Sequence, residues 1–356
     1  MPQKVELNKI FETVTGSHAY GTSIPSSDTD YRGIFIGAKE AIITGMDYAG
    51  TWTDPKAEDR TLYEVRKALL LIADQNPNML ELLWVRDKDI VSSTHEYDLL
   101  RGERESLLSS KAMHTFSGYA FSQLKRIKGH NKWINNPQPK SHPRQVDFLK
   151  VLYACVLGVS KEKVAEDLYR NRDEYVLIKG PLSSFSVMLK DALRHLDLDF
   201  PDSCISERGE LITCAHAIDF YPDRIHYMLG YDANEYKAAK DKHEQYWTWK
   251  NNRNKKRSAL EEEHGYDTKH AMHLIRLLRM GKEILEDGVV NVYRDDAEEL
   301  LEIRAGFYSY DNLIAQAESY QKKLESLYKT TPLQKAVPQK VVKDLLMNIY
   351  EEYWKC

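Results

Sequence analysis

Two aspartates that alternate with other residues stand near the N-terminus, in the segment 27–33 (SDTDYRG). A strand over residues 29–36 would place the carboxylates of Asp28 and Asp30 on one face, close together. Two like charges so close repel each other unless a divalent cation lies between them. Oxygen ligands of this kind suit Mg²⁺ or Mn²⁺ bound together with substrate phosphates. The pair therefore predicts phosphoryl or nucleotidyl transfer.

A Gly-Ser turn stands about ten residues before the aspartates, at Gly16 and Ser17. A glycine at a strand-to-helix turn lets the backbone approach a phosphate closely, and the adjacent N–H groups and the Ser17 hydroxyl can donate hydrogen bonds to phosphate oxygens. We expect this turn to bind the polyphosphate while the aspartates hold the metal. The two features together are far more specific than either alone.

The whole motif, GSxAYGxxxxxSDxDxRG, resembles the DNA polymerase β-like nucleotidyltransferase superfamily, whose signature is a GS turn followed about ten residues later by DxD or DxE. Its form is similar to the branch of predicted bacterial and phage nucleotidyltransferases often called YcgL-like. The resemblance extends through residues 62–84 and 265–285. The motif residues are Gly16, Ser17, Ala19, Tyr20, Gly21, Ser27, Asp28, Asp30, Arg32 and Gly33.

This resemblance implies a mechanism in which three carboxylates and two metal ions direct attack on the α-phosphate of a nucleoside triphosphate such as ATP, with release of pyrophosphate. Asp28 and Asp30 match the first two carboxylates. The third is expected from a neighbouring strand, where Asp59 and Glu64 are the candidates; Asp59 is favoured because Glu64 stands close to the start of the next helix. Asp28, Asp30 and Asp59 would then bind the metal. The residues expected to bind the nucleotide are Gly16, Ser17, Tyr20 and Arg32.

A helix expected near residues 267–285 carries further candidates. Lys269, His273 and Arg276 share one face, opposite a stripe of apolar residues. Such a face is ordinarily only solvated, but beside a triphosphate site it would contact the β and γ phosphates. His270 and His273 alone are weak evidence for a metal site.

The elements that must position these residues fall into two groups. Apolar runs at 9–15, 32–37 and 61–65 predict strands of one small sheet, followed by two helices over 65–84 with a break at Asn76-Pro77. Beyond residue 104 the periodicity predicts helices near 106–128, 145–172, 181–197, 210–220, 267–287 and 338–354. The fold class is therefore α+β, with a mixed-sheet catalytic head over 1–100 and a helical domain over 101–356.

Charge is spread unevenly along the chain, whose 356 residues carry a formal net charge of -4. Residues 106–146 hold seven Lys or Arg and no acidic residue, and residues 237–257 hold eight Lys or Arg, with Tyr246, Trp247 and Trp249 among them. Basic residues mixed with aromatic ones bind phosphates and stack bases. These runs favour a nucleic acid acceptor, RNA more than DNA. The alternatives are a protein or small-molecule acceptor, solvated helix faces, or a non-catalytic nucleic-acid-binding module.

Several other classes fit the sequence poorly. The four cysteines form no CxxC pair, which argues against a structural zinc site and a disulfide scaffold. An aspartyl-phosphate phosphatase would need a hydrophobic strand before its nucleophile, whereas TSIPSS precedes Asp28. The early charges are unlike a signal peptide, and no apolar run approaches the ~18 residues of a membrane span, so we expect a cytoplasmic protein.

Overall fold

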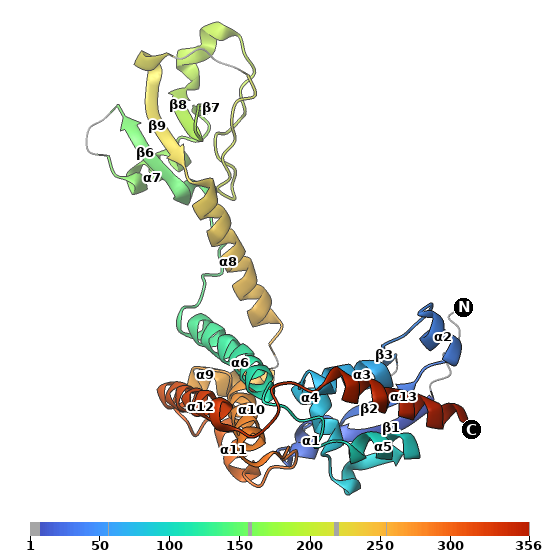
Figure 1. The fold of residues 1–356 in the computed structure, drawn as a ribbon. Helices are drawn as coiled ribbons and strands as arrows, with labels where there is room; N and C mark the ends of the chain where they lie inside the picture. The colour runs from blue at the N-terminus through green and yellow to red at the C-terminus, as the bar shows by residue number, and fades with distance from the viewer. Residues whose placement is uncertain (1–7, 56, 156–158, 217–220, 254, 356) are drawn as a thin grey trace. The chain divides into compact units, whose positions relative to one another are not determined.

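The computed structural model describes residues 8–55, 57–155, 159–216, 221–253 and 255–355. The chain divides into two units, and each is described by itself (Figure 1). Unit 1 comprises Met1–Asn135 and Lys255–Cys356, and unit 2 comprises Asn136–Asn254. The boundary predicted near residue 100 does not coincide with this division, because the segments on either side of it share one core.

A five-stranded mixed sheet lies in the N-terminal part of unit 1, with strand order β3-β4-β2-β1-β5. Its strands are β1 (Asn8–Thr15), β2 (Asp30–Ile36), β3 (Thr51–Asp54), β4 (Ala57–Glu64) and β5 (Ile90–Ser93). β2 is antiparallel to β1 and parallel to β4. The three strands predicted from the apolar runs are β1, β2 and β4, which confirms the small mixed sheet.

Short helices follow two of these strands. α1 (Gly16–Tyr20) begins directly after β1, and α3 (Val65–Ala73) directly after β4. The predicted break at Asn76-Pro77 is confirmed, because α4 (Pro77–Leu80) begins there and the Asn76 side chain accepts a hydrogen bond from the backbone N–H of Asn78.

The rest of unit 1 is helical, apart from short connections. Its helices are α2 (Lys39–Thr44), α5 (His95–Gly102), α6 (Ala112–Asn135), α9 (Lys255–His264), α10 (Thr268–Asp287), α11 (Ala297–Arg304), α12 (Tyr310–Thr330) and α13 (Gln339–Lys355). α10 packs against α6, α11 and α12 and is buried along most of its length. The helices predicted near 106–128, 267–287 and 338–354 correspond to α6, α10 and α13.

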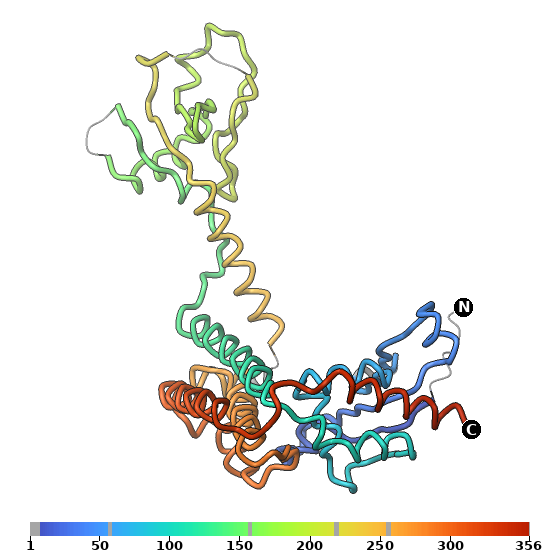
Figure 2. Tube along the Cα trace, in the orientation of Figure 1, coloured from blue at the N-terminus to red at the C-terminus, as the bar shows by residue number. Residues whose placement is uncertain are grey.

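One hydrophobic core joins the sheet to these helices. It contains Phe11 and Ile34 from the sheet, Leu69 from α3, and Leu278 from α10, all fully buried. The C-terminal helix α13 packs against α3 and α5, so segments from opposite halves of the sequence lie side by side in unit 1 (Figure 2). The sheet could not bury its apolar face without helices from the distant C-terminal segment.

Unit 2 corrects the expectation of helices throughout residues 145–220. It holds a four-stranded antiparallel sheet of order β6-β9-β8-β7, with helix α7 (Lys161–Arg170) packed beside β6, while helix α8 (Ala233–Asn251) follows β9 and leads away from the sheet (Figure 1). The strands are β6 (Leu149–Ala154), β7 (Tyr175–Lys179), β8 (Ser184–Leu189) and β9 (Ile225–Tyr231). Alternate residues of β9 are buried, the period of a strand, and short apolar runs do not separate strand from helix by periodicity alone. Of the predicted helix at 210–220, residues 217–220 lie outside the described residues.

Among the described residues, no helix is both long enough and apolar enough to span a bilayer.

Candidate active site

The Gly-Ser turn and Asp30 lie directly against each other where β1 meets β2. Thr15, the last residue of β1, is paired with Asp30, and its hydroxyl donates a 3.3 Å hydrogen bond to the Asp30 carbonyl oxygen. Gly16 follows with a φ of 66°, and a β-carbon there would overlap Oδ2 of Asp30. Only glycine combines this backbone conformation with such close approach of a carboxylate.

The electrostatics of Asp30 show which charged groups surround it. Burial raises the pKa of its carboxyl above the ordinary value, Arg32 and Lys269 oppose this rise, and the negative charges of Asp59 and Asp28 add to it. Asp30 is half-buried, whereas Asp28, Asp59 and Lys269 are exposed. Residues from the turn before β2, from β4 and from α10 thus act on one carboxylate. Asp28 itself precedes the strand, which begins at Asp30 and not at residue 29.

The parallel register of β2 and β4 separates the two candidates for a third carboxylate. Tyr31 is paired with Arg60, and Phe35 with Glu64. Asp59, one residue before Arg60, is therefore level with Asp30. Glu64 is five residues farther along the strand, or roughly 16 Å at the rise of a β-strand. The register places Asp59, and not Glu64, at the end of the sheet where Asp30 lies.

Glu64 has a different set of partners. Its carboxylate is fully buried and accepts hydrogen bonds of 2.8 Å from the Tyr48 hydroxyl, the Arg66 backbone N–H and the Tyr350 hydroxyl. It caps the N-terminus of α3 and ties α13 to the sheet. These contacts account for a buried carboxylate without a catalytic role.

The cationic face predicted for α10 needs correction at two of its three residues. Lys269 is exposed and acts on Asp30, as expected of a residue near a phosphate site. His273 is mostly enclosed, and burial, with the nearby charges of Arg276 and Lys269, lowers its pKa well below the ordinary value. It is therefore neutral at pH 7 and offers no charge to a phosphate.

Arg276 is also part of the core. Its side chain is 5% exposed, and its Nη1 donates a 2.8 Å hydrogen bond to Oε1 of Glu81. Tyr20, which we expected to bind the nucleotide, donates from its hydroxyl to Oε2 of the same carboxylate at 2.7 Å, and its ring lies 3.7 Å from the Arg276 guanidinium. Helical spacing placed Arg276 on the same face as Lys269, but it did not indicate that the buried carboxylate of Glu81 lies beside Arg276. The only sequence signal for Glu81 was an acidic residue inside the apolar run NMLELLW.

The basic run at 106–146 lies mostly in unit 1, and the basic run at 237–257 lies mostly in unit 2. In unit 1, Lys125, Arg126 and Lys128 are exposed on α6, whereas Lys111 forms an ion pair with Asp74 at 2.6 Å. The basic run on α8 lies in unit 2.

The aromatic residues of α8 are largely occupied by packing. Tyr246 is buried, and the Trp247 indole N–H donates to the carbonyl oxygen of Pro139 at 3.0 Å. The lysines around them, Lys237, Lys240, Lys242 and Lys250, are exposed. The run thus presents exposed cations, whereas Tyr246 is buried and Trp247 is bound to the backbone of Pro139.

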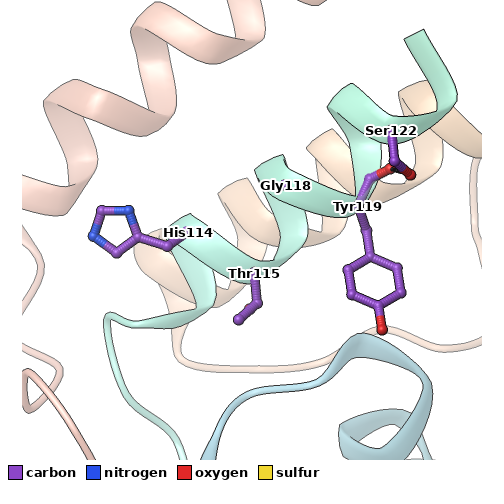
Figure 3. A pocket seen from close by; sticks show the side chains of 5 residues that line it. All are labelled: His114, Thr115, Gly118, Tyr119 and Ser122. Atoms are coloured by element: carbon purple, nitrogen blue, oxygen red, sulfur yellow. Dashed lines mark hydrogen bonds between the residues drawn. The ribbon is translucent and has the colours of Figure 1, made fainter. Parts of the chain in front are cut away.

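A cavity of about 460 Å³ lies elsewhere in unit 1, along one side of α6 (Figure 3). None of the predicted site residues lines it. The Tyr119 hydroxyl at its edge accepts a hydrogen bond from the Asn76 side chain at 2.9 Å. Its lining consists of His114, Thr115, Gly118, Tyr119 and Ser122.

Comparison with known proteins supports the motif. Residues 2–160 match the model of RlaP, described as the RNA repair pathway DNA polymerase beta family. No curated protein and no solved structure matches the chain. The match covers the sheet, the Gly-Ser turn and all three candidate aspartates. Over these residues, the chain is similar to the polymerase β-like nucleotidyltransferase superfamily.

Proposed function

We propose that this protein is a metal-dependent nucleotidyltransferase that moves a nucleoside monophosphate from a nucleoside triphosphate to an acceptor hydroxyl and releases pyrophosphate. The observation that carries the proposal is the Asp30 carboxylate, which lies directly beside Gly16 and on which the charges of Asp28 and Asp59 act. The family match over residues 2–160 supports the reaction class.

The carboxylate set fits a divalent cation. The charges of Asp28 and Asp59 each raise the pKa of Asp30, which means that each of them repels the Asp30 carboxylate. A cation among them would relieve this repulsion, and Mg²⁺ or Mn²⁺ bound by these aspartates would supply charge stabilisation at the reacting phosphate. Asp28, Asp30 and Asp59 are the residues that would hold it.

Other residues of the site would position the triphosphate. The Gly16-Ser17 turn lets phosphate oxygens approach the backbone, and the Ser17 hydroxyl adds a donor. Lys269 is the exposed cation on α10 that acts on Asp30, so it is placed to offset phosphate charge. Arg32, half-buried on β2, acts on the same carboxylate.

RNA is the acceptor that the observations favour. The matched family is described by an RNA repair pathway. The exposed cations of α6 and α8 suit a phosphate backbone, although the rings of Tyr246 and Trp247 are engaged in packing. Transfer to a protein side chain or a small molecule would use the same head with a different acceptor surface.

The test incubates the full chain with Mg²⁺ or Mn²⁺, each labelled nucleoside triphosphate, and separate pools of RNA, DNA and protein. We expect label in RNA and its loss in Asp28→Asn and Asp30→Asn, because removing a metal ligand costs about 4 kcal/mol of transition-state stabilisation, or roughly a thousandfold in rate. Label in the protein pool alone would mean that the acceptor is a protein and that the nucleotidyl transfer reaction still holds. Absence of transfer to every pool, with RNA still bound, would favour a non-catalytic binding module, and transfer at wild-type rate by Asp30→Asn would overturn the metal assignment.

A further inference from the structure

A second group of metal-ligand types lies in unit 1, at the start of α10. His130 of α6, Glu261 of α9 and Asp267, which caps α10, bring one ligand atom each to within 4.8 Å of one another. Both carboxylates are buried, Glu261 with 3% and Asp267 with 0% of its surface exposed. The catalytic aspartates proposed above contribute nothing to this group.

The backbone around the group is held in place by contacts of its own. The side-chain amide of Asn131 donates a 2.9 Å hydrogen bond to the carbonyl oxygen of Gly265, in the turn between α9 and α10. Gly265 has a φ of 76°, a conformation that favours glycine. This turn fixes Asp267 opposite α6, and α10 packs against both α6 and α9, the helices that carry the other two side chains.

A fourth residue, His270, orients one of the carboxylates. Its Nδ1 lies 2.5 Å from Oδ2 of Asp267, and its backbone N–H donates to Oδ1 at 3.0 Å. His130 Nδ1 lies 3.3 Å from the same Oδ2. Carboxylates that ligate a metal are themselves held by hydrogen bonds from neighbouring residues, and His270 holds Asp267 in this way.

We propose that His130, Glu261 and Asp267 form a binding site for a first-row transition metal of the Zn²⁺ type, with His270 as the positioning residue. An imidazole nitrogen with two carboxylates suits Zn²⁺ better than Mg²⁺, which prefers oxygen ligands and retained waters. Three protein ligands and one water complete a four-coordinate zinc site. At zinc bond lengths of about 2.0–2.2 Å, tetrahedral ligand atoms stand roughly 3.5 Å apart, so no pair of these ligand atoms, all within 4.8 Å of one another, would have to approach by more than about 1.3 Å on binding.

The site would tie α6, α9 and the start of α10 together, and its ligand Asp267 stands two residues before Lys269. Because α10 carries Lys269 toward Asp30, metal binding would order the helix end that faces the nucleotide. The alternative is that protonated histidines and carboxylates form ion pairs only. The two arrangements differ in whether the purified protein takes up one equivalent of zinc.

The experiment titrates Zn²⁺ into the chelator-treated full chain against a chromogenic zinc chelator, with excess Mg²⁺ present to occupy the aspartate site. We expect one tightly bound equivalent in wild type, its loss in Glu261→Gln and His130→Asn, and an affinity at least about tenfold weaker in His270→Asn. His130 is 22% exposed, so its variant should fold even where Glu261→Gln does not. Co²⁺ in place of Zn²⁺ should give visible d–d bands that disappear in His130→Asn.

Two matched controls separate this site from others. Asp30→Asn should bind zinc as wild type does, which distinguishes the result from any failure of the proposed transfer reaction. The exposed Cys155 and His226 lie 3.5 Å apart in unit 2 and could take up zinc by themselves. Cys155→Ser is therefore the second control, and it should keep the bound equivalent of zinc if the metal is held in unit 1. Unchanged zinc binding in both Glu261→Gln and His130→Asn, or no bound equivalent in wild type, would overturn the proposal.

Discussion

The buried contact between Arg276 and Glu81 makes a prediction opposite to the one that helical spacing suggested. A phosphate-binding arginine could be replaced at little cost in stability, whereas this one is 5% exposed and paired with a carboxylate that is 4% exposed. Replacing Arg276 with methionine keeps most of the side-chain volume but removes the cation. The buried Glu81 carboxylate then keeps only the hydrogen bond from the Tyr20 hydroxyl, of the two that Arg276 and Tyr20 donate. We therefore expect Arg276→Met to destabilise unit 1 by about 3–5 kcal/mol.

A double-variant cycle tests whether the cost comes from the stranded charge. In Glu81→Leu/Arg276→Met both charges are gone, and the loss that remains is the unpaired Tyr20 hydroxyl, about 1–3 kcal/mol. The double variant should thus be more stable than Arg276→Met alone, a coupling that a pair of independent surface residues would not show. Lys269→Met, an exposed change on the same helix, should stay within about 0.5 kcal/mol of wild type.

Hydrogen exchange of α10 peptides under increasing urea is the assay, because it reports the unfolding of unit 1 separately from unit 2. A parallel titration with a non-hydrolysable nucleoside triphosphate measures binding by the folded protein. We expect Arg276→Met to leave that affinity within about threefold of wild type. The reasoning is refuted if Arg276→Met unfolds within 1 kcal/mol of wild type and binds the nucleotide at least tenfold more weakly.

Three further predictions concern the site and its surroundings. Asp59→Asn should abolish nucleotide transfer while leaving the melting temperature nearly unchanged. Glu64→Gln should mainly lower the melting temperature, because Glu64 caps α3. The reverse pattern in transfer assays and thermal melts would exchange the roles of the two residues. Lys269→Ala should weaken binding of the non-hydrolysable triphosphate in a titration, by an amount that shrinks as salt is raised, and an unchanged affinity would leave Lys269 a solvated residue. Because the pKa of His273 is lower in the folded protein, the unfolded state takes up the proton first as pH falls. The contribution of neutral His273 to the free energy of unfolding is therefore present above about pH 6.5 and is lost as pH falls toward the folded pKa. Urea unfolding at several pH values should show that the free energy of unfolding falls less steeply with acid in His273→Gln than in wild type. An equal acid slope in wild type and variant would contradict the assignment of His273 as a buried neutral residue.

Local pattern determined the features of this protein that depend on neighbours in the chain. Short apolar runs predicted β1, β2 and β4, and the Asn76-Pro77 pair predicted the helix break. The Gly-Ser turn and Asp30 also meet through a local contact, since β1 and β2 are adjacent antiparallel strands joined by one short helix and a loop. The resemblance to the superfamily followed from these few residues, while the catalytic roles of the aspartates stay a prediction.

Tertiary structure decided what depends on residues far apart in sequence. The register of two parallel strands placed Asp59 level with Asp30 and moved Glu64 away, and one-residue slips in that register are invisible to composition. A partner about 200 residues distant buried Arg276, although its helical phase matched that of the exposed Lys269. The sheet of unit 2 and the convergence of His130 with Asp267 likewise came from long-range packing. Periodicity reports which face of an element is apolar; only the fold determines which other element covers it and which charges it brings along.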